Sequence, residues 1–133
     1  MNEEIDMLLN TFRTIAVVGI SNKLGRPSLT VANYLKSQGY DVIPVNPTLS
    51  DVLGVKCYPD LESVPVDIDV VDIFRKPDDV MPVIESAIRK GVKAVWMQEG
   101  IVNEDAAGKA REAGLMVVMD RCMLKEHLKR KGE

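Results

Sequence analysis

The stretch Thr14-Ile-Ala-Val-Val-Gly-Ile20 decides the fold of this chain, because its side chains from Ile15 to Val18 are all apolar. A strand with one face in solvent alternates apolar and polar residues, whereas a strand buried on both faces reads as a continuous apolar run. The stretch therefore predicts an inner strand of a parallel sheet that helices cover on both sides.

Helices and strands alternate outward from this run. A helix is expected before it, where apolar residues from Ile5 to Phe12 recur at helical spacing, and another between Pro27 and Gly39. Further strands are expected over 40–45, 68–74, 93–97 and 115–119, and further helices over 77–90, over 103–113 and after Asp120. This alternation predicts βαβ units, and hence one α/β domain over residues 1–133 with a Rossmann-like, doubly wound parallel sheet of five strands.

Composition and charge limit the classes of function. The net charge of −3 argues against a nucleic acid or a membrane surface as partner, since either favours a basic domain. Acidic residues within 3–6 argue against a signal peptide, and the longest uncharged apolar run, Ile15 to Ile20, is far too short for a membrane span. Cys57 and Cys122 lack the spacing of a disulfide framework or a zinc site. We therefore expect a cytoplasmic protein without a metal.

The loop after the first strand is the first candidate for a ligand site, because doubly wound sheets bind ligands beyond the carboxyl ends of their strands. Gly19 at the strand end and the start of the next helix together present free N–H groups and a positive helix end, which suit a phosphate. Ser21 and Ser28 add hydroxyl groups, and Lys23 and Arg26 add positive charge. The alternative is a plain strand-to-helix turn that needs only one glycine.

Two departures disfavour NAD as the ligand. The dinucleotide pattern G-x-G-x-x-G is not met, because its second and third glycines fall on Ser21 and Leu24. NAD sites also place an acidic residue at the end of the second strand, where this chain has Asn46-Pro47. The position leaves room for a ligand with a phosphorylated ribose.

Other chemically active side chains favour structural interpretations. His127 is the only histidine, and we expect it to be solvated on the last helix, so no catalytic triad can be built. Asp67, Asp69 and Asp72 resemble a metal cluster by composition, but Asp67 and Asp69 would face one side of a strand and Asp72 the other, which favours edge solvation or capping. Cys122 follows Arg121 at a predicted helix N-terminus, which favours a thiolate, although an inert packed cysteine is the alternative.

Five motifs lie, in order, at the carboxyl ends of the predicted strands. They are Val18-Gly-Ile-Ser21, Ile43-Pro-Val-Asn-Pro47, Val71-Asp-Ile-Phe-Arg75, Val95-Trp-Met-Gln-Glu-Gly-Ile101 and Asp120-Arg-Cys122. Together they resemble the small stand-alone CoA-binding proteins of the YccU-like kind. Those proteins are in turn similar to the N-terminal CoA-binding domain of the succinyl-CoA synthetase alpha subunit.

The resemblance implies a sheet of strand order 3-2-1-4-5 and a coenzyme A site on the first loop. It implies that phosphates lie at Gly19, Ser21, Lys23, Arg26 and Ser28, that adenosine lies beside Asn46, Pro47, Phe74 and Arg75, and that the pantetheine arm passes Gln98 and Gly100. Ile20 and Lys76 complete the set of candidate cofactor-binding residues. The synthetase's phosphohistidine belongs to a second domain and does not correspond to His127, so the ligase activity does not carry over.

Several functions remain open at this point. The first interpretation is a module that binds coenzyme A or an acyl-CoA without catalysis, as a carrier, sensor or partner of another protein. The second is an enzyme, either an NAD(P)-dependent oxidoreductase or a subunit of an acyl-CoA ligase that another chain completes. The third is a thiol redox protein that uses Cys122.

Overall fold

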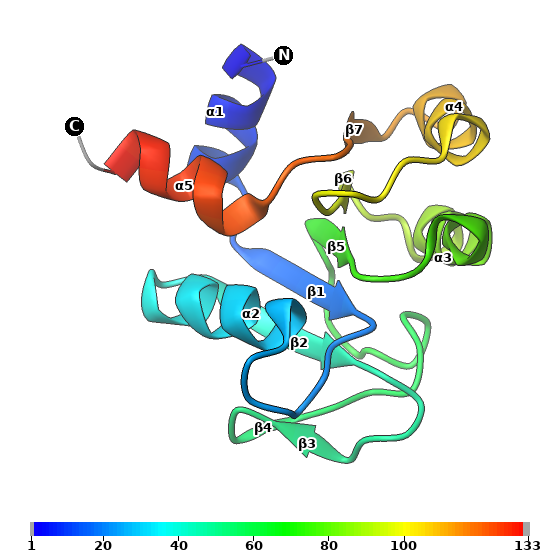
Figure 1. The fold of residues 1–133 in the computed structure, drawn as a ribbon. Helices are drawn as coiled ribbons and strands as arrows, with labels where there is room; N and C mark the ends of the chain where they lie inside the picture. The colour runs from blue at the N-terminus through cyan, green and yellow to red at the C-terminus, as the bar shows by residue number, and fades with distance from the viewer. Residues whose placement is uncertain (1, 132–133) are drawn as a thin grey trace.

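A five-stranded parallel sheet lies between two layers of helices in the computed structural model, which describes residues 2–131 (Figure 1). The strands of this sheet are β1 (Thr14–Val18), β2 (Asp41–Val45), β5 (Val70–Ile73), β6 (Ala94–Met97) and β7 (Met116–Val118). The helices are α1 (Asn2–Thr11), α2 (Pro27–Ser37), α3 (Val80–Lys90), α4 (Glu104–Glu112) and α5 (Met123–Lys131), with a short 3-10 turn η1 (Pro77–Asp79) before α3. The predicted α/β, Rossmann-like class is confirmed.

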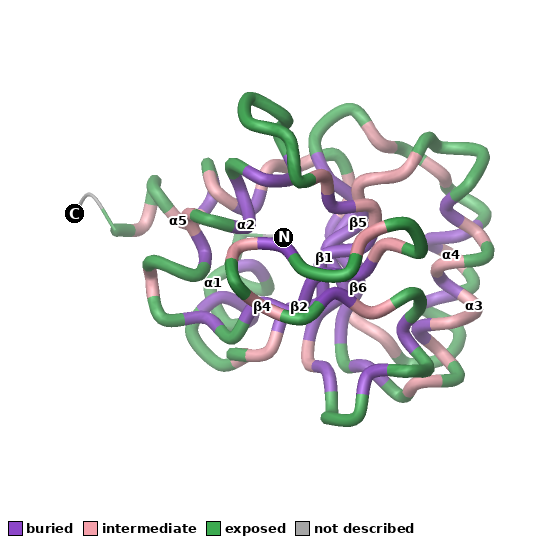
Figure 2. Tube along the Cα trace, turned by 90° about the horizontal axis from the view of Figure 1, so that it is seen from below, coloured by how far each residue is buried: buried purple, intermediate pink, exposed green. Residues whose placement is uncertain are grey.

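The central strands are buried on both faces, as the apolar run in β1 predicted (Figure 2). Successive side chains of a strand point to opposite faces. Accordingly, Ile15 and Val17 pack on the side covered by α1, α2 and α5, whereas Ala16 and Val18 pack on the side of α3 and α4. The sheet thus separates two apolar clusters.

The predicted strand order 3-2-1-4-5 is wrong. The observed order is β2-β1-β5-β6-β7, so that the third long strand pairs with β1 instead of lying beyond β2. The position beyond β2 is taken by Tyr58, which forms a parallel bridge with Val45 and whose N–H donates to the carbonyl of Pro44 (N···O 3.0 Å). No helix forms between β2 and β5. The chain returns on the other side of β1, so the order is 2-1-3-4-5 in the count of long strands.

The corrected order moves the point where strand order reverses. In a 2-1-3-4-5 sheet this switch point lies between the first and third strands, here β1 and β5, and ligands bind in the crevice outside it. The loops that begin after Val18 and after Ile73 therefore face each other at the site. The order implied by the resemblance would have set the loop after β6 beside the first loop instead.

A small hairpin, β3 (Asp51–Val52) with β4 (Val55–Lys56), occupies a region for which only a loop was predicted. Its turn residues Leu53 and Gly54 both have positive φ angles, of 56° and 73°. Such turns are signalled in sequences by Asn-Gly or Asp-Gly, and Leu-Gly lacks that signal. No helix within residues 2–131 has the length and apolarity needed to cross a membrane.

Candidate functional site

A hollow of about 360 Å³ opens at the switch point, between the β1–α2 loop and the loop that leads from β5 to η1. Its walls are formed by Gly19, Ser21, Arg26, Pro27, Ser28, Phe74, Arg75, Lys76, Pro77 and Ile101. Seven of these residues belong to the predicted site: Gly19, Ser21, Arg26, Ser28, Phe74, Arg75 and Lys76. The fold thus brings together two loops that are distant in the sequence.

Gly19 allows the two loops to approach. Its φ angle is +87°, and its N–H donates to the carbonyl of Val45 (N···O 3.0 Å). A β-carbon at this position would lie 2.2 Å from the backbone oxygen of Phe74. Glycine is therefore required here both by the backbone conformation and by the close approach of Phe74.

The two predicted serines shape the first loop. The Oγ of Ser28 accepts a hydrogen bond from the N–H of Ser21 (2.9 Å), and the Oγ of Ser21 accepts one from the N–H of Lys23 (3.0 Å). A hydroxyl that accepts still carries its own hydrogen. Both serines can therefore donate to a ligand without releasing the loop.

Helix α2 begins at this hollow without a side-chain cap. The side chain of Arg26, the N-cap residue, makes no capping bond, and Pro27 at the first helical position has no N–H. The carbonyl of Arg26 accepts from the N–H groups of Leu29 and Thr30 (3.1 Å each).

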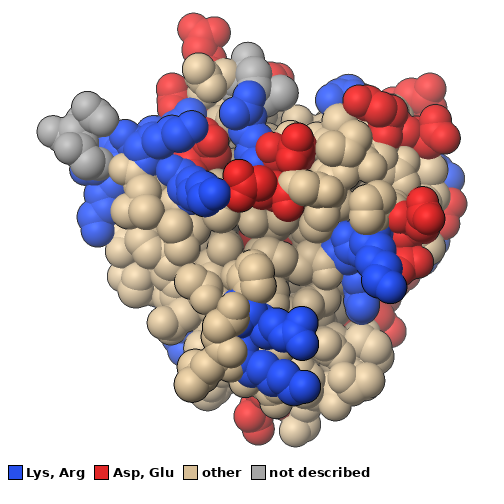
Figure 3. Space-filling view, in the orientation of Figure 1, with Lys and Arg blue, Asp and Glu red and all other residues tan. Residues whose placement is uncertain are grey.

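Figure 3 shows basic side chains over the β1–α2 loop and over the loop after β5, apart from a further basic group over α5. Arg26, Arg75 and Lys76 line the hollow, and no carboxylate is among its lining residues. The helix end and the three cations together favour a polyanion.

A second, smaller hollow of about 160 Å³ adjoins the first on the α3 side of the sheet. It is lined by Val18, Val45, Pro59, Asp60, Leu61, Arg75, Pro82, Val83 and Ser86. Arg75 lines both hollows. Most of the other lining residues were not predicted, because apolar residues on a loop and a helix carry no sequence signal that separates them from core residues.

Some predicted residues brace the site instead of lining it. The side-chain amide of Asn46 donates to the carbonyl of Ile20 (2.8 Å), while its oxygen accepts from the N–H of Thr48 (2.8 Å). The side chain of Ile20 is fully buried. Lys23 and Pro47 are exposed and lie outside the walls of the larger hollow.

Gln98 and Gly100 stabilise a different loop. The side-chain oxygen of Gln98, which is nearly buried, accepts from the N–H of Met123 (3.1 Å) and so caps α5. The N–H of Gly100 donates to the carboxylate of Asp120 (2.7 Å). Neither residue is among those that line the larger hollow.

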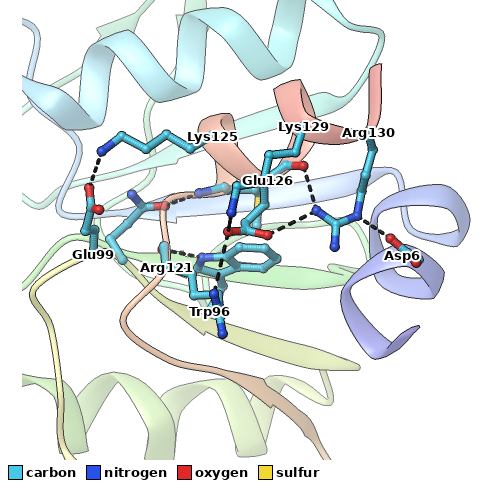
Figure 4. A network of polar contacts seen from close by, with 10 residues as sticks. Asp6, Trp96, Glu99, Arg121, Lys125, Glu126, Lys129 and Arg130 are labelled. Atoms are coloured by element: carbon cyan, nitrogen blue, oxygen red, sulfur yellow. Dashed lines mark hydrogen bonds and ion pairs between the residues drawn. The ribbon is translucent and has the colours of Figure 1, made fainter. Parts of the chain in front are cut away.

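Helix α5 is held further by a polar network (Figure 4). The indole N–H of Trp96 donates to the carbonyl of Arg121 (2.7 Å). Glu126 accepts from Arg130 and Lys129, and Arg130 also pairs with Asp6 on α1. Burial acts to raise the pKa of Glu126, but these hydrogen bonds outweigh burial and lower it.

The two cysteines differ in access. Cys57 is buried, and burial raises the pKa of its thiol. Cys122 is half-buried directly before α5, where its carbonyl accepts from the N–H of Glu126 (2.9 Å). The guanidinium of Arg121, which was expected to favour a thiolate, lies 3.8 Å from the carboxylate of Glu126.

His127 is not solvated as predicted. Its Nδ1 lies 2.7 Å from the hydroxyl oxygen of Tyr34, and its ring meets those of Tyr34 and Tyr40 edge-on. Burial is the main cause that lowers the pKa of this imidazole. The prediction failed because α5 packs across α2, which places this helix face in an interface.

Asp69 and Asp72 have opposite environments. Asp69 accepts from the N–H groups of Arg13 (3.0 Å) and Thr14 (3.1 Å), so the predicted capping is confirmed for it. Asp72 is fully buried, and both of its carboxyl oxygens lack a hydrogen-bond partner, so the same prediction is wrong for it. Within the described part of the chain, no three His, Cys, Asp or Glu side chains are grouped as metal ligands.

A Rossmann-like sheet with an uncapped helix and cations at its switch point is the architecture of a domain that binds a nucleotide-type ligand. The model of one such family, described as a CoA binding domain, matches residues 13–128. The chain belongs to this family, as the resemblance of its motifs predicted.

The relatives include both small proteins and ligases. YneT of Bacillus subtilis, an uncharacterized protein, is 37% identical over 93% of this chain and 92% of its own length. A solved structure of a hypothetical protein from Pyrococcus horikoshii is 46% identical with a TM-score of 0.94, covering 97% of this chain and 91% of that one. The ADP-forming acetate–CoA ligase II of Archaeoglobus fulgidus is 30% identical over 80% of this chain, which spans only 16% of the ligase.

Proposed function

We propose that this chain binds coenzyme A or an acyl-CoA in the hollow at the switch point. The observation that carries the proposal is the meeting of Arg26, Arg75 and Lys76 with the uncapped start of α2 in one hollow. A pyrophosphate at a helix N-terminus accepts from backbone N–H groups and is favoured by the helix dipole. Membership of the CoA binding domain family supports coenzyme A over other polyanions.

The two hollows suit the two parts of such a ligand. The larger one, with its cations and serines, suits the phosphates, and the smaller one has the mainly apolar lining that suits a flat base. Arg75 lines both and would lie between base and phosphate. The pantetheine arm would then leave past Ile101 towards Gln98 and Gly100.

We propose that the chain acts as a binding module. Its single histidine packs against Tyr34, which supports binding without a phosphohistidine step. A second candidate is the CoA-binding part of an acyl-CoA ligase that another chain completes, because related domains make up small shares of ligases. Acyl-CoA formation from ATP, acid and coenzyme A by the chain alone would disprove the first mode. Formation only with a second chain would favour the ligase.

Calorimetric titration with CoA, dephospho-CoA, NAD and NADP tests the ligand. We expect CoA to bind most tightly, with a loss of about 10- to 150-fold when the 3′-phosphate is absent, because a charge-assisted hydrogen bond contributes about 1.5–3 kcal/mol. Arg75→Ala should weaken CoA binding by a similar factor, whereas Arg111→Ala on the exposed face of α4 should not. Preferred binding of NAD, or an unchanged affinity in Arg75→Ala, would contradict the proposal.

A further inference from the structure

Asp72 is a buried carboxyl group at the centre of the sheet. In register it lies between Val17 of β1 and Trp96 of β6, and both neighbours are fully buried. Within residues 2–131, its two oxygens are the only buried side-chain oxygen or nitrogen atoms without a hydrogen-bond partner. An ionised carboxylate in such a place is strongly unfavourable, so the group is held as the neutral acid.

Asp72 lies directly behind the wall of the larger hollow. Asp72 lies on β5, two residues before Phe74, which directly follows the strand and faces the same side of the sheet. This spacing puts their Cα atoms about 7 Å apart. Phe74 lines the hollow, and its backbone oxygen is the atom that a β-carbon at Gly19 would meet. The acid and the bound phosphates would therefore be separated by one layer of backbone.

The charged groups on the covering helices are engaged elsewhere. On α5, Glu126 is bonded to Arg130, and on α1, Asp6 is bonded to the same arginine. On α2, Tyr34 contacts His127 of α5. Burial is the one cause that raises the pKa of Asp72, and it raises that pKa well above the ordinary value.

We propose that Asp72 links ligand binding in this hollow to a proton: the polyanion binds while Asp72 is neutral and is weakened when Asp72 ionises. The inference rests on the proposed function, because it needs an anion in the hollow. Two like charges about 10 Å apart in an effective dielectric of about 20 repel enough to weaken binding about tenfold. Conversely, bound phosphates disfavour the ionised acid, so binding at a pH where Asp72 is partly ionised takes up protons.

Calorimetric titration of CoA over the whole pH range in which the chain stays folded tests the linkage in the whole chain. We expect the wild type to lose about tenfold more affinity across this range than Asp72→Asn, whose amide has the shape of the acid but cannot ionise. Asp67→Asn is the matched control, because it removes an exposed carboxylate before β5, at the opposite end of the strand, and should follow the wild type. Parallel profiles for the wild type and Asp72→Asn would overturn the inference while leaving the CoA site intact. Failure of the wild type to bind at any pH would overturn the proposed function.

A second measurement serves if Asp72→Asn does not fold. The wild type is titrated with dephospho-CoA in buffers of different ionisation enthalpy, which gives the number of protons exchanged on binding. Dephospho-CoA lacks the phosphate monoester that titrates near pH 6, and binding of that monoester to cations would release protons. Net proton uptake at the pH values where binding weakens supports the linkage through Asp72, and net release or no exchange there overturns it.

Discussion

The β1–α2 loop and the turn between β7 and α5 occupy equivalent positions, since each joins a parallel strand to a helix at the carboxyl edge of the sheet. They differ in how their polar groups are used. Helix α2 starts without a side-chain cap, beside cations that line an open hollow. The first N–H of helix α5, that of Met123, donates to the side-chain oxygen of Gln98. Across the turn, the carboxylate of Asp120 accepts from the N–H of Gly100.

We call the β1–α2 loop the open loop, because its helix start and cations can still bind a ligand. We call the turn between β7 and α5 the complete turn, because its polar groups are already hydrogen-bonded within the chain. Unpaired N–H groups at a helix start must find water, a side chain or a ligand, and an anion satisfies them best. The turn before α5 already has internal partners, and the strain of Asp120, whose φ angle is +61°, is offset by its bond to Gly100. Polar residues at strand ends are therefore candidates for binding where the structure leaves them a donor or an acceptor that is not already used within the chain.

The largest effect is expected from Gly19→Ala, which would push the open loop away from Phe74. The new β-carbon would lie 2.2 Å from a backbone oxygen, at a φ angle of +87°. The left-handed conformation costs about 1–2 kcal/mol and the overlap about 1–3 kcal/mol, so unfolding in urea should show a loss of about 2–5 kcal/mol together with loss of CoA binding.

Gly25→Ala is the control for this prediction. Gly25 has a similar φ angle of +86°, but a β-carbon there would meet nothing within 4 Å. Its substitution should cost about 1–2 kcal/mol, the conformational part alone. Equal losses in stability for the two variants would show that the close approach of Phe74 does not require glycine at position 19.

A smaller effect on stability is expected from Gln98→Leu, which would remove the cap of α5 in the complete turn. The buried N–H of Met123 would lose its acceptor, and an unpaired buried group costs about 1–3 kcal/mol. Denaturant unfolding should show this loss, with CoA affinity changing less than in Arg75→Ala. Glu99→Gln, which breaks an exposed pair with Lys125, should cost much less than Gln98→Leu, because exposed ion pairs contribute little to stability. Full stability with lost CoA binding in Gln98→Leu would instead make Gln98 a ligand-binding residue.

The fold class could be predicted from the sequence because a fully apolar run such as Ile15–Val18 has few other uses in a globular chain. The strand order could not be predicted, because the residues of a strand do not determine which strands pair with it. The edge of β2 is taken by a single residue, Tyr58, through backbone bonds that any residue except proline can make. The resemblance supplied an order that this local pairing overrides.

The candidate site was predicted best where residue types have few structural uses. Two predicted arginines, Arg26 before α2 and Arg75 after β5, line one hollow, whereas Lys23 lies outside its walls. Asparagine, glutamine and aspartate serve ligands and backbone equally well, so Asn46 and Gln98 were assigned to the ligand although their side chains bind the chain itself. Likewise, nothing in the sequence shows that Asp72 is buried without a partner.

The smallest effect on stability is expected from a change at Cys122. Modification of this thiol by CoA disulfide tests whether a ligand bound at the open loop reaches the complete turn. Treatment with CoA disulfide should give a mixed disulfide at Cys122: its thiolate attacks one sulfur, a new S–S bond to CoA forms, and CoA thiolate leaves. Cys122 is half-buried directly before α5, so CoA disulfide can reach its thiol. Cys57 should not react, because burial both shields its thiol and raises the pKa of that thiol.

Intact mass and peptide analysis identify the modified cysteine, with Cys122→Ser as the control that should remain unmodified. Because Cys122 is only half-buried, this substitution should change the free energy of unfolding by less than about 1 kcal/mol. Excess desulfo-CoA, which lacks the thiol and so cannot exchange with a disulfide, should slow the reaction if the adduct forms in the CoA site, whereas a direct reaction of Cys122 with CoA disulfide from solution would not be slowed. An adduct on Cys57 alone, or none on either cysteine while CoA is bound, would mean that the pantetheine arm ends away from α5 and that the two loops act independently.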